Sequence, residues 1–102
     1  MRIVVVSGGF DPIHSGHIAY FKAARSHGDK LVIALNSDAW LENKKGKAFM
    51  PFDERKIIIE SLSFVDEVID FEDDDLGSCI KGLEKIKSMY PNEEIIFANG
   101  GD

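Results

Sequence analysis

Four short apolar runs divide the chain: residues 2–6, 31–35, 66–71 and 95–98. Their nearly continuous, β-branched composition is typical of strands that are buried on both faces of a sheet. Three segments with helical spacing of apolar residues lie between them: about 16–27, from about 53, and from about 78 to Pro91. This alternation predicts βαβ units with right-handed crossovers, and therefore an α/β fold with a Rossmann-like open parallel sheet and helices on both faces.

The spacing within the helical segments also predicts local detail. In the second segment, Ile57, Ile58 and Leu62 fall on the expected inward side. Ser78 precedes the third segment and is expected to cap it, because a serine hydroxyl accepts hydrogen bonds from the free N–H groups of a helix start. The lysine-rich segment 44–47 contains a glycine and is expected to be a loop.

Length and charge narrow the class of protein. With 102 residues, the chain is expected to form one domain, residues 1–102, around a single core. The formal net charge is −6, with 12 basic residues dispersed among 18 acidic ones, which argues against a nucleic-acid partner. No run approaches the roughly 20 apolar residues of a membrane span, so no membrane partner is expected. The one cysteine, Cys79, leaves no disulfide within the chain and is compatible with the cytoplasmic location that we expect.

The strongest chemical signal is the segment 8–17, which reads GGFDPIHSGH and joins the first strand to the first helical segment. In open α/β sheets, ligands bind at the carboxyl ends of strands, where the N–H groups of a helix start attract anions. His14 and His17 add two imidazoles, which can donate N–H bonds to phosphoryl oxygens. The spacing fits neither the dinucleotide fingerprint nor the P-loop. The segment therefore predicts a phosphate site of another kind.

The H-x-G-H element at residues 14–17, preceded by Gly-Phe-Asp at 9–11, resembles the signature of the cytidylyltransferase-like nucleotidyltransferases. Further stretches are similar to other parts of that family: the second strand with its terminal Asp38, the lysine-bearing loop 44–47, the P-x-x-x-R-K helix start 51–56, and the third strand 64–69. The nearest likenesses are the glycerol-3-phosphate cytidylyltransferases and the nucleotidyltransferase domain of the ADP-heptose synthases.

The resemblance implies a HUP-type nucleotidyltransferase fold and transfer of CMP or AMP from CTP or ATP to a small phosphorylated acceptor, with release of pyrophosphate. The acceptor would be an alcohol like glycerol 3-phosphate or a sugar like a heptose phosphate. Mg²⁺ would accompany the triphosphate, and no metal-ligating residues are assigned. Members of the family often pair through this domain, so a homodimer is expected.

The expected site residues fall into three groups. Catalysis is assigned to His14, His17 and Lys44. Nucleotide binding is assigned to Gly8, Gly9, Phe10, His14, Gly16, His17, Lys47, Arg55, Gly101 and Asp102. Acceptor binding is assigned to Asp11 and Asp38.

These assignments rest on different grounds. Glycines allow close approach of the backbone to phosphates, and lysine ammonium groups can reach the β- and γ-phosphates. A cation at a helix start, such as Arg55, is unfavourable for the helix dipole, so its position suggests contact with a phosphate or an interface. The acceptor roles and those of Gly101 and Asp102 come from the resemblance.

Structural explanations stay open beside the chemical ones. A histidine of the pair can cap the helix or fill the core, and Phe10 can simply pack. Asp11 can cap a turn, and the lysines can be solvated surface. A zinc site is the competing chemical hypothesis for the histidines, but no second ligand motif accompanies them.

Residues 95–102 resemble the fourth strand and the glycine-aspartate turn that follows it, whereas the R-T-x-G-I-S-type segment of the family is not among the 102 residues. The chain is thus expected to be C-terminally short. A fragment, a partner chain that supplies the segment, and loss of full activity all fit this pattern. A non-catalytic or truncated nucleotide-binding module is therefore the alternative function.

Overall fold

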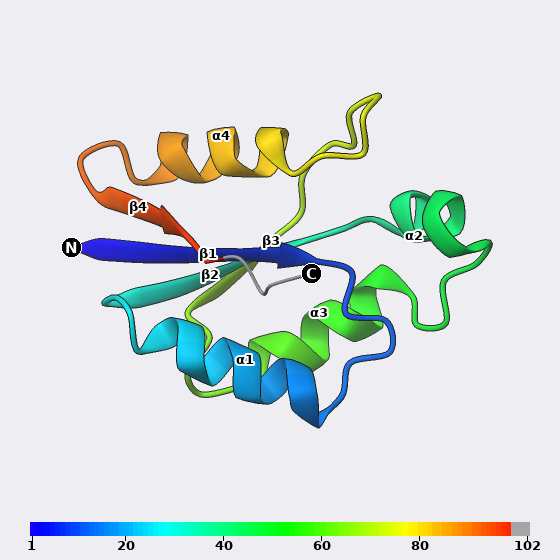
Figure 1. Cartoon of the computed structure of the whole chain (residues 1–102), viewed down its shortest axis with the longest axis horizontal. Coiled ribbons are helices and arrows are strands. Elements are labelled where there is room, and N and C mark those ends of the chain that lie inside the picture. Colours follow the sequence, from blue (N-terminus) through cyan, green and yellow to red (C-terminus); the bar gives the residue numbers. More distant parts are fainter. Residues whose placement is uncertain (99–102) are drawn as a thin grey trace.

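The computed structural model describes residues 1–98 and contains one parallel sheet (Figure 1). Its strands follow the order β3-β2-β1-β4 and all pair in parallel. Their bounds are β1 Arg2–Gly8, β2 Lys30–Leu35, β3 Glu67–Ile69 and β4 Glu94–Phe97. The third strand is shorter than the predicted 66–71, and Gly101 and Asp102 lie outside the described residues.

Helices cover both faces of the sheet, which confirms the predicted α/β, Rossmann-like fold. The four helices are α1 Ser15–Arg25, α2 Asp38–Lys45, α3 Phe52–Glu60 and α4 Ile80–Met89. Figure 1 shows α1 and α3 below the sheet, α4 above it, and α2 beyond one end of the strands. Within residues 1–98, no helix is long and apolar enough to cross a membrane.

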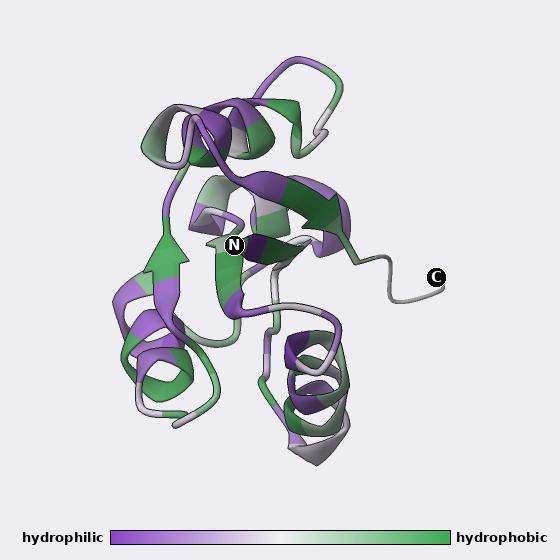
Figure 2. Ribbon diagram, turned by 90° about the vertical axis from the view of Figure 1, so that its left-hand side faces the viewer, coloured by the Kyte–Doolittle hydropathy of each residue, from purple (hydrophilic) through white to green (hydrophobic). Residues whose placement is uncertain are grey.

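The side chains of the two central strands alternate between the two halves of the core. Val4 and Val6 of β1 pack with Phe21 of α1 and Ile59 of α3, all with no exposed surface. The neighbours Ile3 and Val5 point the other way, in the half of the core that includes Ile86 of α4. Figure 2, a view turned by 90°, shows the largely apolar strands between these two helical layers. Because both faces are covered, the strands carry continuous apolar runs.

Helix α2 was not predicted, and the expectation of a loop over 44–47 was wrong for its first half. The hydroxyl of Ser37 accepts a hydrogen bond from the N–H of Trp40, which caps the helix start. Gly46 ends the helix in the left-handed conformation, at φ 91°. Only Leu41 of this helix is buried, so its sequence lacks the apolar stripe that reveals α1 and α4.

Two further local predictions were wrong in part. Of the residues expected on the inward side of the second helical segment, Leu62 packs against the core, but Ile57 does not. Ile57 of α3 is 59% exposed, whereas Arg55 and Ile59 have no exposed surface. These two residues are one helical turn apart and form the inward side of α3, so a charged residue occupies a place where the apolar pattern was sought.

Ser78 is not the N-cap of α4, because Cys79 holds that position without a side-chain hydrogen bond. The Ser78 hydroxyl donates to Asp74 and accepts a long hydrogen bond, at 3.4 Å, from the N–H of Ile80 at the helix start.

Arg55 is the largest fully buried side chain among the described residues, and its guanidinium connects segments that are distant in sequence. Its Nη1 donates to the carbonyls of Gly9 and Asn36, each at 2.8 Å, just after β1 and β2. Its Nε donates to the carbonyl of Met50 at 3.0 Å, and its Nη2 lies 2.7 Å from Oδ1 of Asp38. The guanidinium therefore fixes the positions of both strand ends.

Replacement of Arg55 should destabilise the fold strongly. Arg55→Met keeps an apolar chain of similar length but leaves the carbonyls of Gly9 and Asn36 without their donor. We expect the free energy of unfolding in urea to fall by about 3 kcal/mol, the cost of orphaned buried acceptors. Arg2→Met is the matched control, because Arg2 is 53% exposed in its ion pair with Glu94 and should change the value by about 1 kcal/mol or less. Equal losses in the two variants would contradict this account.

Candidate functional site

Two cavities meet at the carboxyl end of β1 and share one wall. The first, of about 720 Å³, extends toward α1 and the end of β4, and Tyr20, Phe97 and Ala98 belong to it alone. The second, of about 680 Å³, extends toward α2 and the segment 77–79. The residues of the shared wall are Ser7, Gly9, Phe10, His14, His17 and Lys44. The structure therefore brings the three predicted catalytic residues together, between two spaces that can hold two substrates.

The two histidines are held by the first turn of α1. Nδ1 of His14 accepts a hydrogen bond from the N–H of Gly16 at 3.0 Å, and Nδ1 of His17 accepts one from the N–H of His14 at 3.2 Å. The two rings stack with centroids 3.9 Å apart and planes inclined by 28°. The spacing of the two histidines therefore allows each ring to cap the helix start. In the sequence, helix capping was the structural alternative to phosphate binding.

These caps also decide which nitrogen faces the cavities. A ring nitrogen that accepts a hydrogen bond carries no proton, so in each neutral ring the proton is on Nε2. Both histidines line both cavities. The site therefore offers two N–H donors side by side, in fixed orientations, and the caps leave these donors free for a ligand.

Gly16 is required by the position of the His14 ring. A Cβ atom at residue 16 would lie 2.8 Å from Cε1 and 3.1 Å from Nδ1 of His14. Both distances are shorter than ordinary van der Waals contact, so any other residue would push the imidazole out of place. The glycine of the motif thus has a steric reason that spacing alone could not reveal.

Phe10 packs against one ring of the pair, that of His17, and has an unusual backbone conformation. Its φ is 50°, in the left-handed region that non-glycine residues rarely adopt. Its ring packs edge-on against His17 at 5.1 Å and against Phe21 at 4.8 Å, measured between ring centroids. The Phe10 ring therefore connects His17 to the core residue Phe21. Contact of Phe10 with a nucleotide stays a prediction.

The environment of His17 favours its neutral form. Burial, and secondly the nearby His14, lower the pKa of the His17 imidazole below its ordinary value. Protonation at Nδ1 would also remove the acceptor of the N–H bond from His14. The ring is therefore a neutral N–H donor at pH 7 until a phosphate raises its pKa.

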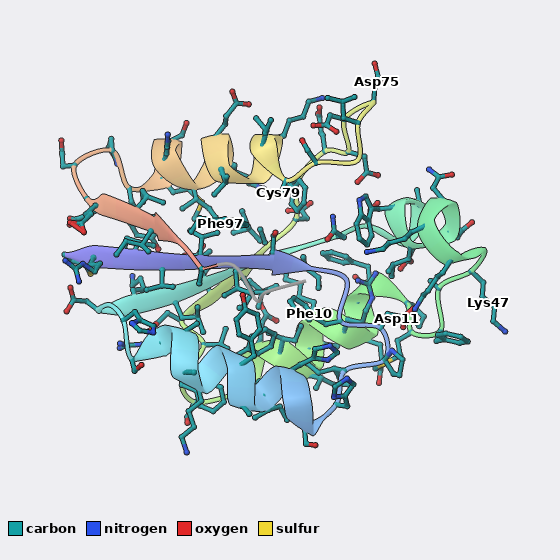
Figure 3. The ribbon with its side chains drawn as sticks, in the orientation of Figure 1. Phe10, Asp11, Lys47, Asp75, Cys79 and Phe97 are labelled. Carbon is teal, nitrogen blue, oxygen red and sulfur yellow. The ribbon has the colours of Figure 1, made fainter. Side chains whose placement is uncertain are left out.

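Two lysines of the 44–47 segment reach the site: Lys45 lines the second cavity only, where it pairs with Asp11, whereas Lys44 is on the shared wall. Lys44 thus lines both cavities, and its Nζ lies 4.7 Å from the centroid of the Trp40 ring. Lys47, predicted to bind nucleotide, instead lies near Phe49, outside the two cavities. Figure 3 shows its side chain directed away from the molecule beyond α2.

Asp11, predicted to bind the acceptor, lines the second cavity, but its carboxylate is engaged by protein groups. Its side chain has no exposed surface and accepts hydrogen bonds at 2.6 Å from the N–H groups of Phe49 and Met50. Nζ of Lys45 lies 3.0 Å from its Oδ2. Burial acts to raise the pKa of this carboxyl, but the hydrogen bonds and Lys45 outweigh burial and lower it. Asp11 therefore anchors the segment after α2 and has little capacity left for a ligand.

Two other predicted site residues also bind protein groups. Arg55 was assigned to the nucleotide, but its side chain has no exposed surface and its donors bind protein oxygens. Asp38 was assigned to the acceptor, but it pairs with Arg55 and lies outside the two cavities. Both residues position the strand ends that carry the site, which is the physical reason for their place in the pattern.

Sequence reasoning also missed residues that line the cavities. Asn36, 4% exposed, lines the second cavity beside Trp40, whose Nε1 donates to the carbonyl of Gly77 at 2.9 Å. Tyr20 lines the first cavity and donates to the carbonyl of Ala98 at 2.9 Å. The one signal available for Asn36 was its position directly after a strand.

The titration of His17 tests this geometry. We expect a midpoint below the ordinary value of about 6.5, with the neutral ring protonated on Nε2. Nitrogen chemical shifts of the imidazole, followed against pH by NMR and assigned with His17→Gln, measure both. Because the folded pKa is lower than the unfolded one, the unfolded chain binds more protons below about pH 6.5, and stability should fall as pH drops through that window. A midpoint at or above 6.5, or a proton on Nδ1, would contradict the caps.

Comparison with known proteins agrees with this geometry. The chain is 35% identical to the bifunctional protein HldE of Enterobacter sp. (strain 638) over 113 residues. It is 37% identical to the protein of the same name from Salmonella arizonae over 112 residues. Both alignments cover 99% of this chain and 24% of the relative, so the chain spans about a quarter of the length of these relatives.

Two solved structures share the fold. The lipopolysaccharide core biosynthesis protein from Thermoplasma volcanium GSS1 aligns with a TM-score of 0.71 at 25% identity, over 100% of this chain and 99% of that one. A protein of unknown function from Archaeoglobus fulgidus aligns with a TM-score of 0.57 at 18% identity, over 97% and 90% of the two chains. The family model described as cytidylyltransferase-like matches residues 5–102. That match includes the histidine pair, both cavities and most of the sheet, and the chain therefore belongs to the cytidylyltransferase-like family.

Proposed function

We propose that this chain is a nucleotidyltransferase domain that transfers CMP or AMP from CTP or ATP to a small phosphorylated alcohol or sugar. The observation that carries the proposal is the pair of stacked imidazoles on the wall between two cavities, each with its Nδ1 used by the backbone and its Nε2 left for a ligand. The family and the HldE relatives support this class of reaction.

The reaction needs a positioned phosphate and stabilised charge. A phosphate oxygen of the acceptor attacks the α-phosphorus, and the bond from that phosphorus to the oxygen bridging to the β-phosphate breaks. The bond's electron pair leaves with pyrophosphate. The acceptor is a phosphate monoester with a second pKa of about 6, so it is mostly ionised at pH 7 and needs no dedicated base. The Nε2–H groups of His14 and His17 would stabilise the charge that develops around the α-phosphate, and Lys44 would stabilise the leaving pyrophosphate.

The surroundings suggest which cavity takes which substrate. The first cavity contains Gly16 and the N-terminal turn of α1, and it extends to Ala98, the last described residue before the predicted nucleotide residues Gly101 and Asp102. We assign the nucleotide to it.

The second cavity is lined by Asp11, the residue expected at the acceptor, and is bordered by α2, so we assign the acceptor to it. Gly8, expected to bind the nucleotide, also lines this cavity. In-line transfer then takes place across the wall that the two cavities share.

Mg²⁺ would enter as part of the nucleotide complex. Among residues 1–98, no three His, Cys, Asp or Glu side chains come together as a metal site, and Asp11 is already paired. Magnesium is commonly held by substrate phosphates together with water and few protein groups. The donors of this site therefore fit a triphosphate that carries its own ion.

Removal of either histidine should slow turnover. For His14→Ala and His17→Ala, we expect kcat to fall by about 10²–10³, or about 2.7–4 kcal/mol, as for loss of one preorganised donor. The assay measures pyrophosphate release from CTP or ATP with Mg²⁺ and a panel of phosphorylated alcohols and sugars. Calorimetry measures nucleotide binding in parallel. His27→Ala is the control, since His27 is exposed and lies outside both cavities.

The same assay tests the alternative function. Nucleotide binding that depends on His17, without turnover on any acceptor, would favour a non-catalytic nucleotide-binding module. Wild-type turnover in both histidine variants would refute the assigned roles.

Gly16→Ala separates the position of the imidazole from the stability of the helix. Alanine is the better helix former by about 0.5–1 kcal/mol, but its Cβ would lie 2.8 Å from Cε1 of His14. We expect the free energy of unfolding to change little while kcat falls by about 10²-fold, because a displaced His14 ring is no longer aligned with the substrate. Ser15→Ala, at the exposed neighbouring position, should retain activity. Unchanged turnover in Gly16→Ala would show that His14 has room to move.

A further inference from the structure

Asn36 has a side chain that the protein itself does not use. The residue follows β2 and is 4% exposed. Its backbone is fully engaged: the N–H donates to the carbonyl of Gly8 at 2.9 Å, and its carbonyl accepts from Arg55 at 2.8 Å. Across residues 1–98, however, no group forms a hydrogen bond with its side-chain amide. An amide at the edge of the core without a protein partner is available to bind a ligand.

The amide opens into the second cavity. Asn36 lines that cavity and not the first. Within the described part of the chain, no fully buried side-chain nitrogen or oxygen lacks a hydrogen bond. The small accessible surface of Asn36 therefore includes its unpaired amide atoms. A molecule in the second cavity can reach both the amide oxygen and the amide N–H₂ group.

The rest of this cavity limits what such a molecule can be. His14, His17 and Lys44 on the shared wall favour an anionic group. Among residues 1–98, the one carboxylate that lines the cavity, Asp11, is paired with Lys45. The Nε1 of Trp40 is occupied by the carbonyl of Gly77, so the indole offers apolar surface. The cavity thus suits a phosphate at one end and, at Asn36, a group that both donates and accepts hydrogen bonds.

We propose that Asn36 determines acceptor specificity by binding a hydroxyl group on the carbon body of the phosphorylated acceptor. A hydroxyl is the small neutral group that can donate to the amide oxygen or accept from the amide N–H₂. Asn36 thereby favours phosphorylated polyols and sugars over phosphates that carry no hydroxyl. This inference rests on the proposed function, because it assigns the second cavity to the acceptor.

The test compares Asn36→Leu with the wild type in two thermal-unfolding measurements. In the free protein, leucine has a similar size and removes an unpaired amide, so we expect a midpoint equal to or above that of the wild type. With millimolar ligand, glycerol 3-phosphate or mannose 1-phosphate should raise the wild-type midpoint more than methyl phosphate does, and this difference should vanish in Asn36→Leu. Asn92→Leu, at an exposed turn, is the control and should keep the difference between the hydroxylated phosphates and methyl phosphate.

A second variant covers the case in which leucine disturbs packing. Asn36→Asp keeps the size of the side chain but replaces the donor with a carboxylate that repels phosphate, so protection by all three phosphates should be lost. A midpoint of free Asn36→Leu several degrees below the wild type, with protection retained in Asn36→Asp, would overturn the proposal. So would equal wild-type midpoints in the three phosphates.

These readouts measure binding and need no turnover. The proposed function fails separately, if the wild type neither binds a nucleoside triphosphate nor releases pyrophosphate.

Discussion

The buried guanidinium of Arg55 is the interaction on which the arrangement of the site depends. It binds the carbonyls of Gly9 and Asn36, and so it joins the residues that directly follow the two central strands. The sheet positions these strands by backbone pairing, but it does not position the chain beyond their ends. A planar group with several donors can hold more than one carbonyl in a fixed geometry, which a lysine could not do.

Both cavities of the site depend on this anchor. Gly9 is in the wall that they share, and Asn36 lines the second one. Asp11 provides another connection, because its carboxylate binds the backbone of Phe49 and Met50 and thereby joins the segment between β1 and α1 to the segment after α2. Charged residues that the sequence assigned to substrates, Arg55 and Asp11, thus hold loops in place. This arrangement preorganises the remaining donors before a ligand arrives.

Each histidine of the pair uses one ring nitrogen for the structure of the helix start and has the other available to a ligand. Nδ1 of each ring caps the start of α1, which fixes the ring and its tautomer, and Nε2 is left for the ligand. Structural capping and phosphate binding were competing interpretations of this motif. The geometry makes them compatible, because the two functions use opposite sides of the same ring.

The sequence alone predicted the parallel sheet, the helices α1, α3 and α4, and the place of the candidate site between β1 and α1, because apolar periodicity and the H-x-G-H spacing are local properties of the chain. It did not determine which charged residues face a ligand. Arg55 and Gly9 are 46 residues apart, Asp11 and Phe49 are 38 apart, and only folding brings each pair into contact. Tertiary structure therefore decided that Arg55, Asp11 and Asp38 hold loops. It also placed Lys44 rather than Lys47 beside the histidines, because burial and pairing depend on distant segments.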